Sequence, residues 1–135
     1  MRRFWAAVIL IWAVSSAPAL AAKIPIKVVV LTTFERGADT GDAPGEFQHW
    51  AESYPLKKSL VVPGIERPVR YTDDGVLGVV TGMRARPREA VAALISGGQF
   101  DVSHAYWIVA GIAGVDPRSG AIGSAAWARW VVDGD

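Results

Sequence analysis

The 135-residue sequence has no cysteine, so it contains neither a disulfide framework nor a thiolate metal site. Its two histidines, His49 and His104, are too far apart in sequence to form a local metal-binding pair, and we expect no metal and no cofactor. Beyond residue 21 no apolar run is long enough to cross a bilayer. The chain also has no large excess of positive or negative charge, with 14 basic and 13 acidic residues. This balance argues against a nucleic acid partner.

What is present is the composition of a folded chain, with 51% hydrophobic and 20% charged residues. The length allows one modest domain.

The first residues have the pattern of a secretory signal peptide. Arg2 and Arg3 precede the apolar run Phe4–Val14, and Ala19-Leu20-Ala21 has the small-x-small form of a cleavage site. A membrane anchor is the alternative, but 11 residues at about 1.5 Å each fall short of roughly 30 Å of hydrocarbon. The sequence thus predicts a signal peptide over residues 1–21, export to the periplasm, and a mature chain without a membrane span. Loss of both arginines leaves 12 basic and 13 acidic residues, a net charge of −1.

The rest of the chain alternates apolar β-branched runs with amphipathic segments, a pattern typical of an α/β sheet with helices on both faces. Phe47, Trp50, Ala51 and Tyr54 share one helical face, and Pro55 ends that helix. The predicted strands are Ile24–Thr32, Leu60–Val62, Val69–Tyr71, Val76–Thr81, Ala105–Ala110 and Ile122–Val132, and the predicted helices start at Pro44 and span Pro87–Ser96. We expect Phe47, Trp50 and Tyr54, and likewise Val91, Leu94 and Ile95, to face the core.

Glycine-containing loops follow three of these strands, over Thr32–Gly45, Thr81–Arg86 and Gly111–Pro117. If the strands are parallel, the loops leave the same edge of the sheet, where such sheets bind ligands.

Several motifs in order resemble the purine nucleoside permease family from about Lys27 to the last residue. They are Leu31-Thr32-Thr33-Phe34-Glu35, Gly45-Glu46-Phe47, Gly82-Met83, Phe100-Asp101 and Ala110–Pro117. Gly111-Ile112-Ala113-Gly114 is also distantly similar to a loop of the nucleoside phosphorylase and nucleosidase superfamily. Members of the permease family are longer, so we expect residues 22–135 to be the N-terminal part of a phosphorylase-like α/β domain, a mixed sheet flanked by helices and truncated to its N-terminal half.

The resemblance implies a purine nucleoside as ligand. Gly111, Ile112, Ala113 and Gly114 are candidates for ligand contact through the backbone, the alternative being a tight turn that needs positive φ. Ile112 occupies a position that is often serine in the phosphorylases, which argues against phosphate chemistry in this loop.

Charged residues near the strand ends are further candidates. Glu35 and Arg36 could meet the sugar hydroxyls, or form a solvated loop. Glu46 and His49, three residues apart, are weak candidates for proton transfer, the alternative being a surface pair. The cluster Arg84, Arg86 and Arg88 is either an anion site at a helix start or a solvated basic loop.

Two functions remain open at this point. The first is nucleoside binding in support of uptake, and the alternative is an enzyme that cleaves nucleosides outside the inner membrane, as a phosphorylase or nucleosidase. The sequence does not indicate an oligomeric state.

Overall fold

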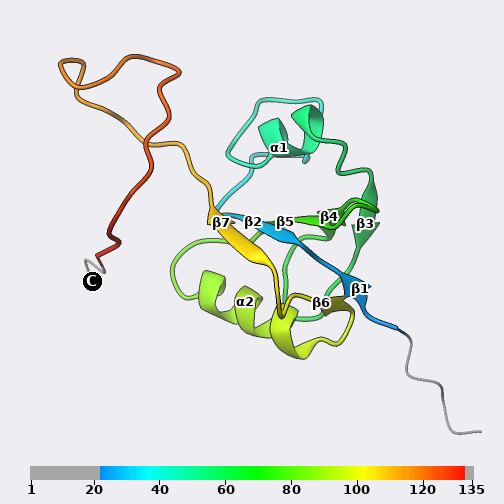
Figure 1. Cartoon of the computed structure of the whole chain (residues 1–135). Helices are drawn as coiled ribbons and strands as arrows, with labels where there is room; N and C mark the ends of the chain where they lie inside the picture. Colours follow the sequence, from blue (N-terminus) through cyan, green and yellow to red (C-terminus); the bar gives the residue numbers. More distant parts are fainter. Residues whose placement is uncertain (1–21, 133–135) are drawn as a thin grey trace, which may run out of the picture.

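A five-stranded mixed sheet, in the order β3-β4-β5-β2-β7, forms the centre of the computed structural model, which describes residues 22–132 (Figure 1). The elements are β1 (Ile24–Pro25), β2 (Val28–Thr32), α1 (Gln48–Ser53), β3 (Lys58–Leu60), β4 (Val69–Tyr71), β5 (Val76–Val80), α2 (Arg86–Ser96), β6 (Phe100–Asp101) and β7 (Tyr106–Val109). The predicted α/β class with a mixed, helix-flanked sheet is confirmed. The predicted signal peptide, residues 1–21, lies outside the described residues.

β2 is the central parallel strand, paired with β5 on one side and β7 on the other. Its residues Val29 and Val30 point to opposite faces of the sheet and are 0% and 1% exposed. Burial on both faces explains why this strand is a continuous apolar run and not an alternating one. β3 and β4 extend the sheet beyond β5 in antiparallel pairing.

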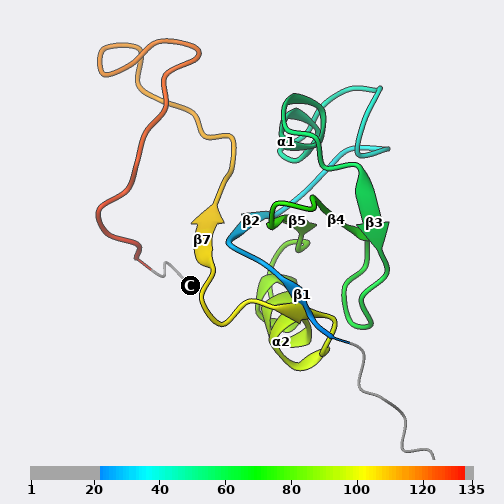
Figure 2. The ribbon, with the colours of Figure 1, turned by 45° about the vertical axis from the view of Figure 1, so that its right-hand side comes forward.

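The two helices lie on opposite sides of this sheet (Figures 1 and 2). On the α2 side, Ala90 and Leu94 join a buried cluster with Val29, Leu77 and Val79. On the α1 side, a smaller cluster contains Phe47, Leu56 and Val80. The predicted arrangement of helices on both faces is therefore confirmed.

Gly78 in β5 allows the α1 side to pack closely. A Cβ atom at this position would lie 2.6 Å from a ring carbon of Phe47 and 2.9 Å from Leu56 Cδ1. Phe47 is 1% exposed, so its ring has little room to move away.

We therefore expect Gly78→Ala to lower the free energy of unfolding by about 1–3 kcal/mol through overpacking. Gly114→Ala is the matched control, because a Cβ there meets no atom within 4 Å. Urea denaturation of both variants checks this, and equal midpoints for the two would contradict the close packing of Phe47 on β5.

The segment predicted as one strand, Ile24–Thr32, is divided into β1 and β2, which pair with different partners. β1 pairs with β6, a short strand that the sequence analysis did not predict. Between them, Lys27 and Val28 both donate their N–H groups to the Gly75 carbonyl, which turns the chain from one strand partner to the other.

Two further boundaries differ from the prediction. α1 begins at Gln48 and not at Pro44, because Gly45 lies against the backbone of Glu35, where a Cβ would be 3.0 Å from Glu35 Cα. β3 ends at Leu60, and Val62 is buried without belonging to a strand.

The predicted strand Ile122–Val132 is wrong. Residues 121–132 contain no strand and are exposed. An apolar pattern alone does not make a strand, since a strand also needs backbone pairing with a neighbour. Among the described residues β7 pairs with β2 alone, so this segment does not use the outer edge of β7.

The core predictions are partly right. Phe47 and Leu94 are buried, Trp50 and Val91 are partly buried, but Tyr54 and Ile95 are 37% and 60% exposed. Tyr54 proves wrong because it lies just outside α1, where the chain has already turned to an extended conformation with φ −116° and ψ 135°. Ile95 proves wrong because it lies on a side of α2 that does not join the core cluster.

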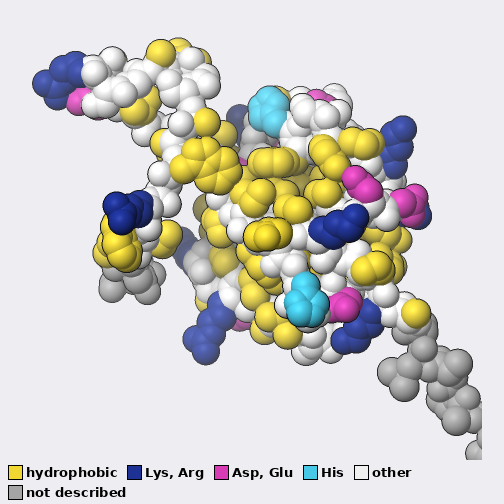
Figure 3. Space-filling model, viewed as in Figure 1, with side chains coloured by type: hydrophobic (Ala, Val, Ile, Leu, Met, Phe, Trp, Pro, Cys, Tyr) yellow, Lys and Arg dark blue, Asp and Glu magenta, His cyan; other side chains and the backbone are white. Residues whose placement is uncertain are grey.

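Hydrophobic side chains remain exposed on β7 and on residues 110–132, a segment that we call the arm. Tyr106 and Val109 of the outer strand are 79% and 77% exposed, and Trp127 and Trp130 of the arm are 83% and 79% exposed. Figure 3 shows hydrophobic side chains on the surface of the face that carries β7 and along the arm. The arm stands apart from the sheet in both ribbon views (Figures 1 and 2).

An open strand edge beside exposed apolar side chains favours association between molecules. We expect the protein to self-associate with rising concentration and Val109→Lys to reduce this association. Sedimentation velocity measures it, with Thr40→Lys at an exposed loop position as control. Concentration-independent sedimentation of the wild type would contradict the expectation.

Candidate functional site

The three glycine-containing loops leave the same edge of the sheet. β2, β5 and β7 are parallel, with Thr32 in register with Val80 and Leu31 with Val109. Backbone pairing continues one residue further, since Thr81 donates its N–H to the Thr32 carbonyl and Ala110 to the Leu31 carbonyl. The carboxyl ends of the three strands are thus fixed relative to one another, as the sequence predicted.

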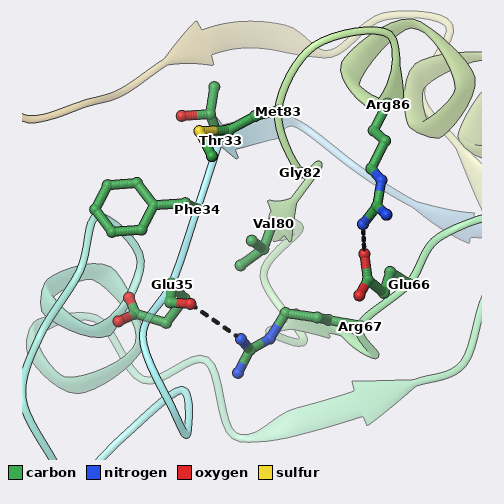
Figure 4. A pocket seen from close by; sticks show the side chains of 9 residues that line it. All are labelled: Thr33, Phe34, Glu35, Glu66, Arg67, Val80, Gly82, Met83 and Arg86. Carbon is green, nitrogen blue, oxygen red and sulfur yellow. Dashed lines mark hydrogen bonds and ion pairs between the residues drawn. The ribbon is translucent and has the colours of Figure 1, made fainter.

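A cavity of about 220 Å³ opens at this edge. Phe34, Thr33 and Met83 lie on one side of it, and Arg67, Glu66 and Arg86 lie on the other (Figure 4). The remaining lining residues are Glu35, Val80 and Gly82. The loops after β2 and β5 therefore share one hollow with an apolar side and a charged side.

Two arginines on the charged side have different surroundings. Arg67 donates hydrogen bonds to the Glu35 carbonyl at 3.3 Å and the Gly37 carbonyl at 2.5 Å, and forms an ion pair with Asp39 at 3.1 Å. Arg86 forms an ion pair with Glu66, and both of these side chains are mostly exposed. Arg67 is therefore held by the loop after β2, whereas Arg86 is held only by a solvated pair.

Glu35 directs its carboxylate to the start of α1. Its Oε2 accepts hydrogen bonds from the N–H groups of Phe47 at 2.7 Å and Gln48 at 2.6 Å, and its Oε1 from Gly45 at 2.5 Å. Phe47, the N-cap residue, supplies no side-chain cap, so Glu35 takes its place from outside the helix. Both carboxylate oxygens are occupied, which does not support the predicted contact of Glu35 with sugar hydroxyls.

These contacts shift the ionisation of Glu35. Burial raises the pKa of its carboxyl, but hydrogen bonds from backbone N–H groups, among them those of Gln48 and Gly45, lower the pKa more, so it lies below the ordinary 4.5. The folded state therefore binds the proton more weakly than the unfolded chain, and the ionised carboxylate stabilises the fold.

We expect Glu35→Gln to lower the free energy of unfolding by about 1–2 kcal/mol at neutral pH, the cost of losing a helix cap. The variant and the wild type differ most in free energy of unfolding above pH 4.5, where Glu35 is ionised in both the folded and the unfolded state. This difference disappears as the pH falls through the lowered pKa of Glu35 in the folded state. Thermal unfolding against pH measures it.

Glu66→Gln serves as the control, since an exposed ion pair contributes about 0–1 kcal/mol. A Glu35→Gln variant as stable as the wild type at pH 7 would contradict the capping role.

Glu46 connects the loops after β2 and β7. Its Oε2 accepts hydrogen bonds from the N–H of Thr33 at 2.7 Å, the hydroxyl of Thr33 at 2.9 Å and the N–H of Phe34 at 3.2 Å. Its Oε1 accepts a longer bond from the Ile112 N–H at 3.4 Å. Glu46 precedes α1, while His49 is exposed on that helix, so the geometry gives no support to a Glu46–His49 proton-transfer pair.

The Gly111–Pro117 loop is exposed throughout. Neither Gly111 nor Gly114 has positive φ, so the alternative of a turn that requires glycine for this reason does not apply. A Cβ at Gly111 would lie 3.1 Å from Glu46 Oε1, so glycine there leaves the carboxylate room. Ile112 and Ala113 are exposed as well, and a ligand role for these four residues stays a prediction.

The arginines that the sequence singled out lie at different distances from the cavity. Arg36 is exposed near the cavity, and Arg86 lines it. Arg84 and Arg88 are exposed outside the cavity lining, as expected for a solvated loop, and Arg84 has a φ of 65°, uncommon for a residue with a side chain.

The sequence analysis missed Phe34, Glu66 and Arg67 as lining residues. Arg67 and Glu66 lie in the irregular segment between β3 and β4, where no periodic pattern points to a site. A hint in the sequence existed only for Phe34, which lies two residues after the end of a buried strand and next to the predicted candidate Glu35.

The described residues, 22–132, contain neither a candidate metal site nor a helix that could span a membrane. No group of three His, Cys, Asp or Glu side chains in this part could hold a metal ion. None of its helices has the length and apolar character needed to cross a membrane.

Comparison with known proteins gives one finding. The family model described as purine nucleoside permease (NUP) matches residues 25–135. No curated protein and no solved structure matches the chain.

Proposed function

Because the chain belongs to the purine nucleoside permease family, we propose that it binds a purine nucleoside at the carboxyl edge of its sheet, in support of nucleoside uptake. The family places the chain in a nucleoside transport-related role. The observation that carries the proposal is the cavity at the ends of β2 and β5, where ligands of parallel sheets bind.

The two sides of the cavity suit the two halves of a nucleoside. Phe34 and Met83 offer a face on which a purine ring can stack, and such stacking contributes about 1–3 kcal/mol per base. The guanidinium groups of Arg67 and Arg86 donate hydrogen bonds to ring nitrogens or carbonyl oxygens of the base.

The size of the cavity indicates how a nucleoside is placed. Complete ligand pockets measure roughly 300–1,000 Å³, more than the 220 Å³ found here. The cavity therefore takes the base, and the sugar lies along the strand ends toward Gly111, where Ile112 and Ala113 offer backbone contacts.

The remaining parts of the proposal concern the setting of the protein. Residues 1–21 act as a secretory signal peptide, and residues 22–135 belong to a phosphorylase-like α/β domain in the periplasm. The transport role is then indirect, through binding of the nucleoside outside the inner membrane.

Isothermal titration calorimetry with inosine and adenosine tests the proposal. We expect saturable binding, and we expect Phe34→Ala to weaken it by about 5- to 150-fold through loss of stacking. Trp127→Ala is the matched control, because this aromatic side chain is exposed on the arm and should leave affinity unchanged.

The same samples, incubated with and without phosphate, are analysed for free base. Binding without release supports the proposal, and release in either condition supports the nucleoside-cleaving enzyme instead. Absence of binding to the wild type contradicts both functions.

A further inference from the structure

The carboxylate of Glu46 has one fixed oxygen and one that is largely unoccupied. Oε2 is held by the Thr33 N–H, the Thr33 hydroxyl and the Phe34 N–H, at 2.7 to 3.2 Å. These donors belong to the end of β2 and its loop, so they set the orientation of the whole carboxylate.

The other oxygen, Oε1, accepts only the long 3.4 Å bond from the Ile112 N–H among the described residues. An ionised carboxylate oxygen accepts more than one hydrogen bond and donates none. Gly111 lies beside it without a side chain, and Ile112 is exposed, so a ligand can approach Oε1 from solvent.

Thr33 and Phe34 join this oxygen to the cavity. Both residues line the cavity (Figure 4), and both donate their N–H groups to Glu46. A group attached to a base in the cavity and extending toward Gly111 therefore passes Glu46.

We propose that Glu46 Oε1 accepts a hydrogen bond from a ribose hydroxyl, so that the site selects ribonucleosides over deoxyribonucleosides. This proposal rests on the proposed function and gives to Glu46 the sugar contact that the sequence suggested for Glu35. Glu46 suits this contact better, because the oxygens of Glu35 already hold the N–H groups of Gly45, Phe47 and Gln48. The anchored Oε2 means that Oε1 needs little reorganisation to bind the hydroxyl.

The test compares adenosine, 2′-deoxyadenosine, 3′-deoxyadenosine and adenine by calorimetry. We expect the wild-type protein to bind adenosine about 10- to 100-fold more tightly than at least one of the deoxynucleosides, as expected for a hydrogen bond to a charged group. In Glu46→Gln this preference falls to a few-fold or less, while the affinity for adenine is unchanged.

Two further variants separate recognition from folding. Gly111→Ala places a methyl group 3.1 Å from Oε1 and leaves the Oε2 anchor intact, so it should also reduce the preference, even if Glu46→Gln fails to fold. Glu52→Gln, which alters an exposed carboxylate bonded to Gln48 and Gly41, should keep the full preference.

Failure of the inference and failure of the proposed function give different results. Equal affinity of the wild type for all three nucleosides, or a full preference retained in both Glu46→Gln and Gly111→Ala, overturns the role of Glu46. No binding of any nucleoside or of adenine by the wild type overturns the proposed function itself.

Discussion

The carboxyl edge of the sheet depends on two glutamates that accept hydrogen bonds from backbone N–H groups. Glu35 binds the first N–H groups of α1, and Glu46 binds those at the end of β2 and, more weakly, the Ile112 N–H. Unpaired backbone donors are costly, and loops that cross a sheet edge have few carbonyl partners. Glu46 supplies acceptors where the ladder of β2 ends, and Glu35 supplies them where α1 begins. Together they fix the loops around the cavity.

The central part of the fold was predictable because each of its elements is determined by the residue pattern within its own segment. Val28–Thr32 and Val76–Val80 are apolar runs, as expected of strands buried on both faces, and Pro87 followed by spaced apolar residues predicts α2 closely. The gathering of three loops at one edge then follows from parallel pairing alone.

What could not be predicted depends on contacts between distant segments. The division of Ile24–Thr32 requires β6 and the Gly75 carbonyl, neither of which has a signal in that segment. Ile122–Val132 shows the opposite case, in which a strand-like pattern is present but the segment pairs with no strand among the described residues.

In the candidate site, too, the contacts between distant segments could not be predicted from the sequence. Glu35 and Glu46 were named from the sequence, but their roles depend on which N–H groups they reach: Glu35 stabilises α1, and Glu46 lies between two loops. Arg67 enters the cavity from an irregular segment that packs against the loop after β2.

The central claim is that a purine nucleoside binds where the loops after β2, β5 and β7 meet. Amide NMR spectra recorded during a titration with adenosine test it most directly. The account expects the resonances of Thr33, Phe34, Gly82 and Ile112 to shift together with one dissociation constant. Shifts confined to the groove lined by Ile95, Phe100 and Trp107 on the α2 side, with these four amides unchanged, would contradict it.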